Sequence, residues 1–260
     1  MSGWRVEVSP PKQGADRLEE RLGRFARRFN TSCEAGFQVC ITDNAMGKLA
    51  FQGCELLAEL ALPAARAMIH LNTFHTLAEL RWILDSAAHL GVRELLVVSG
   101  DGSARLPRLK PADLGETGAV VTSVELLAFI TREYPGVFNL GAAFNPYEPQ
   151  GHELEKLKRK LAAGARFFIT QPVIGRHPAV DALLEWLSVP LVVEAWMSPK
   201  LELLKDCVGY DPGAGATGPF DPLRCLSEIR TNYPGCGLYL ALFDLKTQLP
   251  ALVRDGGLAA

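Results

Sequence analysis

Short apolar runs alternate with longer amphipathic stretches along most of the chain. The clearest case lies between Leu140 and Pro172, where an apolar run over 140–144 is followed by a polar loop and a stripe of leucines at helical spacing. Gly164 ends that stripe, and a second apolar run covers 165–169. Short apolar runs joined by a helix are typical of a right-handed βαβ unit, so this stretch predicts parallel strands whose carboxyl ends share one edge.

The same alternation predicts eight strands in the whole chain. The expected strands cover 5–8, 36–41, 67–71, 95–98, 140–144, 165–169, 191–193 and 238–242. No shift in composition marks a domain boundary, so we expect residues 1–260 to form a single (β/α)8 TIM barrel, a fold that typically takes about 250 residues. A doubly wound sheet is the competing α/β architecture, but no G-x-G-x-x-G follows the first strand.

Two of the expected helices carry clear end signals. One begins at Thr122 or Ser123, with Glu125 placed for a capping box, and runs to about Tyr134. Another ends at Gly91, the residue type that most often follows a helix. A further helix is expected over 200–208.

Composition excludes several classes of protein. The chain is 48% hydrophobic and 22% charged with a net charge of -2, which gives no bias towards nucleic acid. The basic run 156–160 follows acidic residues and is interpreted as a solvated helix face. The six cysteines form no C-x-x-C pair, so we expect reduced thiols in a cytoplasmic protein. No apolar stretch reaches the roughly 18 residues of a membrane span, and the N-terminus does not resemble a signal peptide.

Polar residues at the carboxyl ends of barrel strands are the expected site residues. They are Glu7, Thr42, Asp43, Asn44, His70, Asn72, Asp101, Asn145, Gln171, Glu194 and Asp244. The histidines show no H-E-x-x-H spacing, so no metal site is expected. There is also no G-x-S-x-G motif that would support covalent hydrolysis.

Four of these residues have both a structural and a functional interpretation. Glu7 either points outward or lies in the barrel mouth, where desolvation would raise its pKa and make it a proton donor. Asp101 either caps a turn or accepts hydrogen bonds from a ligand ring. Gln171 either bonds backbone or pairs with an amide-like heterocycle. A lone histidine in an apolar strand, such as His70, is more often a core residue than a ligand.

Several segments, taken in order, resemble the methylenetetrahydrofolate reductase family. They are Glu7 with 9–12 (SPPK), 39–44 (VCITDN), 69–71 (IHL), 98–101 (VSGD), and the basic helix through Gly164 to 169–171 (ITQ). The resemblance covers roughly residues 4 to 172, and beyond Val173 only the pattern matches. It implies a (β/α)8 barrel that carries FAD and reduces methylenetetrahydrofolate to methyltetrahydrofolate.

The resemblance also implies roles for individual residues. Glu7 would protonate folate N10, Asp101 would bind the pterin near the flavin, and Gln171 would hold the pterin edge with Asn145 beside the substrate. The residues implied on the flavin side are Thr42, His70, Gly100, Ala143, Phe144, Glu153 and Lys160. NAD(P)H would be the electron donor, and the chain would act as a homo-oligomer or as a subunit of a one-carbon complex.

The chain departs from the family on the flavin side. Ser99 stands where the family usually has Arg, Phe144 stands where it often has Tyr, and the loop 145–151 is short. The opening VEVSPPK also differs from the aromatic-rich form common in the family. Two other functions therefore remain open. One is methyl transfer from a pterin to a corrinoid, and the other is a non-catalytic folate-binding subunit.

Overall fold

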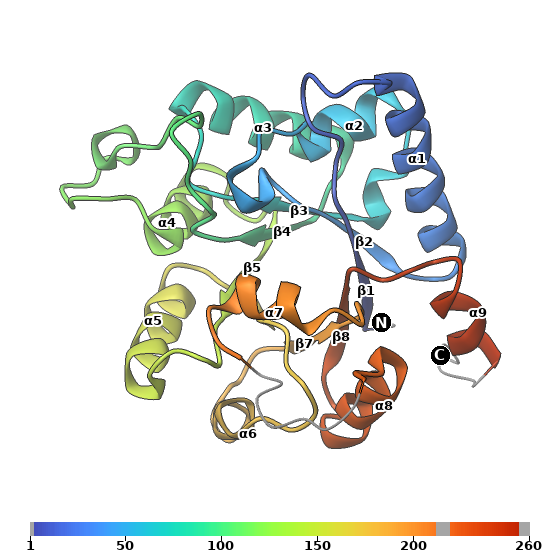
Figure 1. The fold of residues 1–260 in the computed structure, drawn as a ribbon. Helices are drawn as coiled ribbons and strands as arrows, with labels where there is room; N and C mark the ends of the chain where they lie inside the picture. The colour runs from blue at the N-terminus through green and yellow to red at the C-terminus, as the bar shows by residue number, and fades with distance from the viewer. Residues whose placement is uncertain (1–2, 212–218, 255–260) are drawn as a thin grey trace.

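The computed structural model describes residues 3–211 and 219–254, which form eight parallel strands closed into one barrel. Each strand pairs with the next along the chain, and β8 pairs with β1 (Figure 1). The strands are β1 (Trp4–Val8), β2 (Gln38–Ile41), β3 (Ala67–Leu71), β4 (Glu94–Val97), β5 (Asn139–Phe144), β6 (Phe167–Thr170), β7 (Leu191–Trp196) and β8 (Gly237–Ala241). The predicted (β/α)8 barrel is confirmed.

Helices follow the strands and surround most of the barrel (Figure 1). They are α1 (Leu18–Glu34), α2 (Gly53–Glu59), α3 (Leu77–Leu90), α4 (Ser123–Glu133), α5 (Gln150–Ala162), α6 (Pro178–Leu184), α7 (Leu201–Val208), α8 (Pro222–Asn232) and α9 (Gln248–Arg254), with 3-10 helices η1 (Ala45–Gly47), η2 (Ala64–Arg66) and η3 (Pro111–Leu114). Both predicted end signals are confirmed. Thr122 caps α4 with Glu125 in a capping box, and Gly91 ends α3 with a φ of 83°.

Helix α6 and the end of β7 differ most from the sequence prediction, and β2 and β6 each begin two residues later than predicted, at Gln38 and Phe167. Helix α6 was not predicted, because it has only seven residues and buries only Val180 and Leu183 on its inner face. Strand β7 continues past its predicted end at Val193 as far as Trp196. Glu194 interrupts the apolar run, but its side chain has the parity of the barrel interior, so the strand carries on beyond it.

Side chains on each strand alternate between the helices outside and the barrel interior. The outward residues, such as Val6, Ile41 and Val97, join the helices in one large hydrophobic core. The interior holds a second, smaller cluster. Its buried members are Cys40, Met68, Leu96, Phe167, Ile169, Val192, Trp196, Leu204, Tyr239 and Ala241.

Phe167 fills the lower part of the interior. Its ring lies where a side chain at Gly141 would be, because a Cβ built on Gly141 would come within 2.3 Å of two ring atoms. The Arg5 guanidinium carbon lies 5.4 Å from the centre of the same ring. Below it, Arg5 Nη2 lies 3.1 Å from Glu94 Oε2, and Asn139 Nδ2 donates to Glu94 Oε1 at 3.1 Å. The amino-terminal end of the barrel is therefore closed by packing and by charge.

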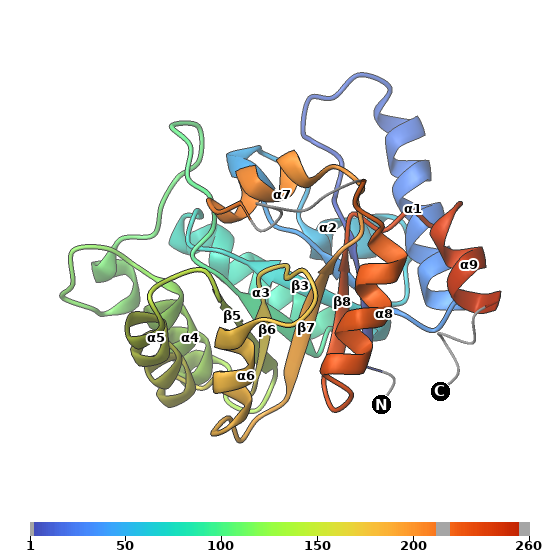
Figure 2. The ribbon, with the colours of Figure 1, turned by 60° about the horizontal axis from the view of Figure 1, so that its bottom comes forward.

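Helix α7 lies over the opposite end, at the carboxyl ends of the strands (Figure 2). Its Leu204 is fully buried and belongs to the interior cluster rather than to the outer core. Trp196 Nε1 donates to Lys200 O at 3.3 Å, just before the helix begins. After the helix, the Tyr210 ring stacks on Tyr147 with 5.1 Å between the ring centres. The helix that the sequence predicts over 200–208 thus covers the barrel mouth.

The contact between Gly141 and Phe167 generates a stability prediction. Gly141→Ala should lower the free energy of unfolding by about 1–3 kcal/mol, because the added methyl group forces the Phe167 ring out of its packed position. Gly151→Ala in α5 is the matched control, since nothing lies within 4 Å of a Cβ there. It should stabilise the chain by up to about 1 kcal/mol through backbone entropy. Urea denaturation measures both changes, and an unchanged midpoint for Gly141→Ala would contradict the packing described.

Candidate active site

Four inward side chains form a polar group at the mouth of the barrel. Glu7 comes from β1, His70 from β3, Glu194 from β7 and Tyr239 from β8, and all but the buried tyrosine are half-buried. Tyr239 pairs in register with Glu194 on β7 and with Arg5 on β1. Glu7 lies two residues beyond Arg5, towards the carboxyl end of β1. The group lies above the apolar interior and beneath α7.

Glu7, Tyr239 and His70 are joined in a chain of hydrogen bonds. The Tyr239 hydroxyl lies 3.0 Å from Glu7 Oε2 and 3.3 Å from His70 Nε2. Burial lowers the pKa of His70 to about 4, so the ring is neutral near pH 7 and its Nε2–H can donate to Tyr239. Tyr239 can then donate to Glu7 Oε2, which leaves Glu7 Oε1 to hold the proton when the carboxyl group is neutral.

Burial also raises the pKa of Glu7, and this effect is larger than the opposing effects of the Tyr239 hydrogen bond and of Arg28. Glu194 has no role assigned by the sequence, although it is one of the polar strand-end residues. Burial raises the pKa of Glu194 well above its ordinary value, and the charge of Glu7 adds to the shift. Two neighbouring carboxyl groups in a desolvated mouth favour a state in which at least one is protonated.

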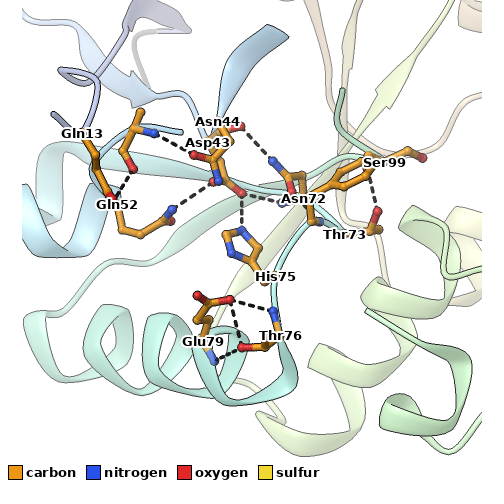
Figure 3. Close-up of polar contacts among 12 residues, drawn as sticks. Gln13, Asp43, Asn44, Gln52, Asn72, Thr73, His75, Thr76, Glu79 and Ser99 are labelled. Atoms are coloured by element: carbon orange, nitrogen blue, oxygen red, sulfur yellow. Dashed lines mark hydrogen bonds and ion pairs between the residues drawn. The ribbon is translucent and has the colours of Figure 1, made fainter. Parts of the chain in front are cut away.

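Asp43 organises the loops after β2 and β3 rather than facing a ligand (Figure 3). Its Oδ2 accepts the Asn72 backbone N–H at 2.9 Å and lies 2.7 Å from His75 Nε2, and the Asp43 side chain is 1% exposed. Gln52 Nε2 donates to Asp43 Oδ1 at 3.3 Å. Asn72 Nδ2 returns a bond to Asp43 O at 2.8 Å, and Asn44 Oδ1 holds the backbone of the following loop. These residues fix the upper rim of the barrel.

Asp101 lies at the same rim and is exposed. Its Oδ2 accepts the backbone N–H of Met46 at 2.9 Å, which ties the loop after β4 to η1. Cys207 of α7 lies within electrostatic reach of both Asp101 and Glu7, because both charges add to the rise that burial causes in the pKa of its thiol. Gly100, the residue before Asp101, packs against Asn72, so Asp101 lies on the rim that Asn72 and Asp43 form.

Asn145 and Gln171 follow neighbouring strands. Asn145 Oδ1 accepts the Tyr147 backbone N–H at 3.1 Å, so the side chain shapes its own turn. Gln171 lies two residues beyond the inward Ile169 and is half-buried, and its backbone N–H donates to Phe144 O at 2.7 Å. Within the described ranges its side-chain amide has no hydrogen-bond partner. Asp244, beyond β8, is exposed and accepts from Thr247 Oγ1 at 2.8 Å, as a turn residue does.

The residues predicted on the flavin side were tested against the charge of FAD. The FAD diphosphate needs cations or free N–H groups. Lys160 is the only cation among the predicted residues, and it is 8% exposed, with its Nζ 2.6 Å from Ala143 O and 3.8 Å from Glu153 Oε1. Glu153 is itself 2% exposed and accepts the Asn145 N–H at 3.0 Å, so freeing Lys160 would leave a buried carboxylate unpaired.

The other predicted flavin residues bring no positive charge. His70 is neutral and bonded to Tyr239, Phe144 is buried, and Gly100 has a φ of 79° and packs against Asn72. The Thr42 hydroxyl is buried without a hydrogen-bond partner in the described part of the chain, so it offers one polar contact. This set of residues does not fit the diphosphate of FAD.

Residues 3–211 and 219–254 contain neither a metal-binding cluster nor a membrane-spanning helix. No group of three or more His, Cys, Asp or Glu side chains is placed to hold a metal ion in this part of the chain. None of the helices described there is both long enough and apolar enough to cross a bilayer.

The eight-stranded barrel and the carboxyl group of raised pKa at its mouth place this protein among the (β/α)8 barrels that carry an acidic residue at the carboxyl ends of their strands. The model of the methylenetetrahydrofolate reductase family matches residues 3–186, and the chain belongs to that family. Membership places it in folate-related one-carbon chemistry. No curated protein sequence matches the chain.

Several solved structures are similar to this chain at low sequence identity. A protein from Clostridium thermocellum, described as binding two copies of 5-methyl-5,6,7,8-tetrahydrofolic acid, superposes with a TM-score of 0.63 and 13% identity, over 98% of this chain and 95% of the other. A 2,3-dimethylmalate lyase superposes at 0.48 with 12% identity, over 98% and 81%. A phosphoenolpyruvate phosphomutase from Streptomyces platensis subsp. rosaceus superposes at 0.45 with 14% identity, over 97% and 83%.

The hydrogen-bond chain predicts how a single hydroxyl controls Glu7. Tyr239→Phe removes the donor that stabilises the charged form of Glu7, so the pKa of Glu7 should rise further. Carbon-13 NMR of glutamate carboxyl groups measures this shift, with Glu7→Gln used to assign the signal. Tyr233→Phe is the matched control, because the Tyr233 hydroxyl bonds the His177 backbone elsewhere. An unchanged pKa of Glu7 in Tyr239→Phe would contradict the inference that Tyr239 donates its hydrogen bond to Glu7.

Proposed function

We propose that this protein reduces 5,10-methylenetetrahydrofolate to 5-methyltetrahydrofolate, with Glu7 as the general acid. The observation that carries the proposal is the state of Glu7, a half-buried carboxyl group whose pKa is raised by burial at the carboxyl end of a barrel strand. Pure binding of folate does not need an acid at this position. Family membership supplies the substrate class.

The reaction needs a proton and a hydride at different atoms. Glu7 gives its proton to N10 as the bond between N10 and the bridging carbon breaks, and the imidazolidine ring opens to an iminium at N5. Hydride then adds to that carbon and produces the methyl group. Reduced nicotinamide nucleotide is the expected source of hydride, and the protein contributes position and charge.

The remaining mouth residues suit a pterin. Gln171 presents an amide that can donate and accept, which matches the amide-like edge of the ring system. Asp101 brings a negative charge that would favour the positive iminium. Asn145 lies at the end of the neighbouring strand. These assignments are part of the proposal and follow the family resemblance at each position.

The ligand of the Clostridium thermocellum protein supports the choice of substrate. That protein binds 5-methyltetrahydrofolic acid, which is the product of the reaction proposed for this chain. At 13% identity the similarity shows a shared fold, and the ligand of that protein identifies 5-methyltetrahydrofolate as the compound to test for binding.

If Glu7 is the general acid, its substitution should reduce turnover and leave the affinity for folate nearly unchanged. Glu7→Gln keeps the volume and the hydrogen bond from Tyr239 but has no proton to give, so turnover of methylenetetrahydrofolate should fall by about 10²–10⁴-fold. The dissociation constant for 5-methyltetrahydrofolate should change by less than about threefold, because the lost step occurs only in the transition state. Turnover is followed by nicotinamide absorbance and affinity by calorimetry.

The controls distinguish the rival functions. Glu59→Gln removes an exposed carboxylate at the end of α2 and tests whether the loss of one negative charge elsewhere on the chain has the same effect. Equal losses of turnover and affinity in Glu7→Gln would make Glu7 a binding residue. Wild-type protein that binds folate but shows no turnover would instead support a non-catalytic folate-binding subunit.

The pairing of charges on the flavin side predicts the absorbance spectrum of the purified protein. We expect protein purified without added cofactor to lack the visible bands of oxidised flavin, because Lys160, the one cation among the residues predicted on that side, is already paired with Glu153 and Ala143 O. Titration with FAD should leave the flavin fluorescence unquenched. Bound flavin at one equivalent per chain would overturn this prediction and return Lys160 to the cofactor site, where Lys160→Met should then release it.

A further inference from the structure

Glu194, on β7, differs from the other acids of the mouth because its carboxyl group has no partner. It lies inward and half-buried, and within the described chain its side chain accepts no hydrogen bond and forms no ion pair. Neither of its oxygens is among the fully enclosed side-chain atoms that lack a partner, so a ligand can reach both. A desolvated acid without donors is costly, and a ligand that supplies N–H groups would remove that cost.

The surroundings of Glu194 place it near the centre of the mouth. In four groups from different elements, burial raises the pKa and the charge of Glu194 adds to the shift. They are Cys40 of β2, Tyr147 of the β5–α5 loop, Cys207 of α7 and Tyr239 of β8. Burial raises the pKa of Glu194 itself, and the charge of Glu7 raises it further. No cation of the described chain opposes this rise, so Glu194 is not part of an internal ion pair.

The neighbouring strand end brings an amide beside this acid. The backbone of Glu194 is bound to the β6 segment on both sides of Gln171, because Glu194 N–H donates to Thr170 Oγ1 at 2.9 Å and Val173 N–H donates to Glu194 O at 3.0 Å. Gln171 therefore lies next to Glu194, at the spacing of about 5 Å that separates neighbouring strands. Its amide also has no hydrogen-bond partner in residues 3–211 and 219–254.

This acid and amide are complementary to one edge of a pterin. That edge carries an amino group at C2, an N–H at N3 and a carbonyl oxygen at C4, in this order. A carboxylate accepts two parallel N–H groups with its two oxygens. The Nε2 group of a glutamine beside it can then donate to the carbonyl oxygen.

The other two acids of the mouth and its rim are already engaged. Glu7 Oε2 accepts from the Tyr239 hydroxyl at 3.0 Å, and Asp101 is exposed with its Oδ2 bound to the Met46 backbone N–H at 2.9 Å. Binding of two adjacent N–H groups needs both oxygens of one carboxylate. Among these three acids, Glu194 alone has both oxygens without a partner in the described structure.

We propose that Glu194, as a carboxylate, binds the 2-amino and N3–H groups of the pterin while Gln171 donates to the carbonyl oxygen at C4. Glu194 then determines the specificity of the mouth for ligands with a 2-amino-4-oxo ring edge. This assignment rests on the proposed function, which places a folate in the mouth.

The test compares 5-methyltetrahydrofolate with its 2-desamino-2-methyl analogue, in which a methyl group replaces the 2-amino group. Wild-type protein should bind the parent compound at least about tenfold more tightly, because the analogue loses a hydrogen bond to a charged group. The preference should fall below about threefold in Glu194→Met, which has no carboxylate, and to an intermediate value in Glu194→Gln, whose amide has one acceptor atom. Calorimetry measures each dissociation constant, and urea denaturation checks that each variant is folded.

Glu202→Met is the matched control, because Glu202 is exposed on α7. It should keep the full preference for the 2-amino group, and so should Asp101→Asn. A preference that is unchanged in Glu194→Met overturns the proposal. Loss of the preference in Asp101→Asn with its retention in Glu194→Met would assign the ring edge to Asp101 instead.

A pterin without the rest of folate separates this inference from the proposed function. Wild type should bind 6-methyltetrahydropterin at least about tenfold more tightly than Glu194→Met does, whatever the protein does to methylenetetrahydrofolate. A preference for the 2-amino group without turnover would reject the reductase and keep the role of Glu194. Turnover with equal binding of parent compound and analogue would keep the reductase and remove Glu194 from the pterin edge.

Discussion

The site depends on how the barrel interior is filled. Closing eight strands into a barrel gives each inward side chain a fixed set of neighbours. A large aromatic side chain therefore fits in the interior only where a neighbouring strand has a glycine. Phe167 occupies the space left by Gly141, and the ion pair of Arg5 with Glu94 lies beneath that ring. Water is therefore excluded from below, and the inward polar residues of the next layer are desolvated on that side.

Desolvation gives the mouth its chemistry. A carboxylate at the same height on an open surface would titrate near its ordinary pKa, whereas burial raises the pKa of both Glu7 and Glu194. The cover of α7 acts in the same direction, because Leu204 closes the interior cluster from above. The apolar packing favours the protonated form of Glu7. The hydrogen bond from Tyr239 to Glu7 Oε2 then leaves the proton on Oε1.

The fold could be predicted from the sequence because apolar strands and amphipathic helices have different periods. The short α6 was missed, and the end of β7 and the starts of β2 and β6 were misplaced by two or three residues. Glu7 could be predicted because it interrupts an apolar strand. Tyr239 could not be predicted as a site residue, because a tyrosine between two leucines is typical of a core position and only its register with Glu194 places it in the polar group. The pairing of Asp43 with His75 joins residues 32 positions apart, and Lys160 within a basic run gave no sign that it turns inward to Ala143 O.

The distribution of paired and unpaired cations shows where this mouth can accept negative charge. On the side of α5, Lys156 and Lys160 both lie near Glu153, so an anionic ligand there would have to displace a buried carboxylate. On the side of α1, Lys12 and Arg21 have no carboxylate to displace in the described structure, and their charges already face a cavity. Water solvates these cations in the free protein, so replacing it with carboxylates costs far less than breaking a buried pair.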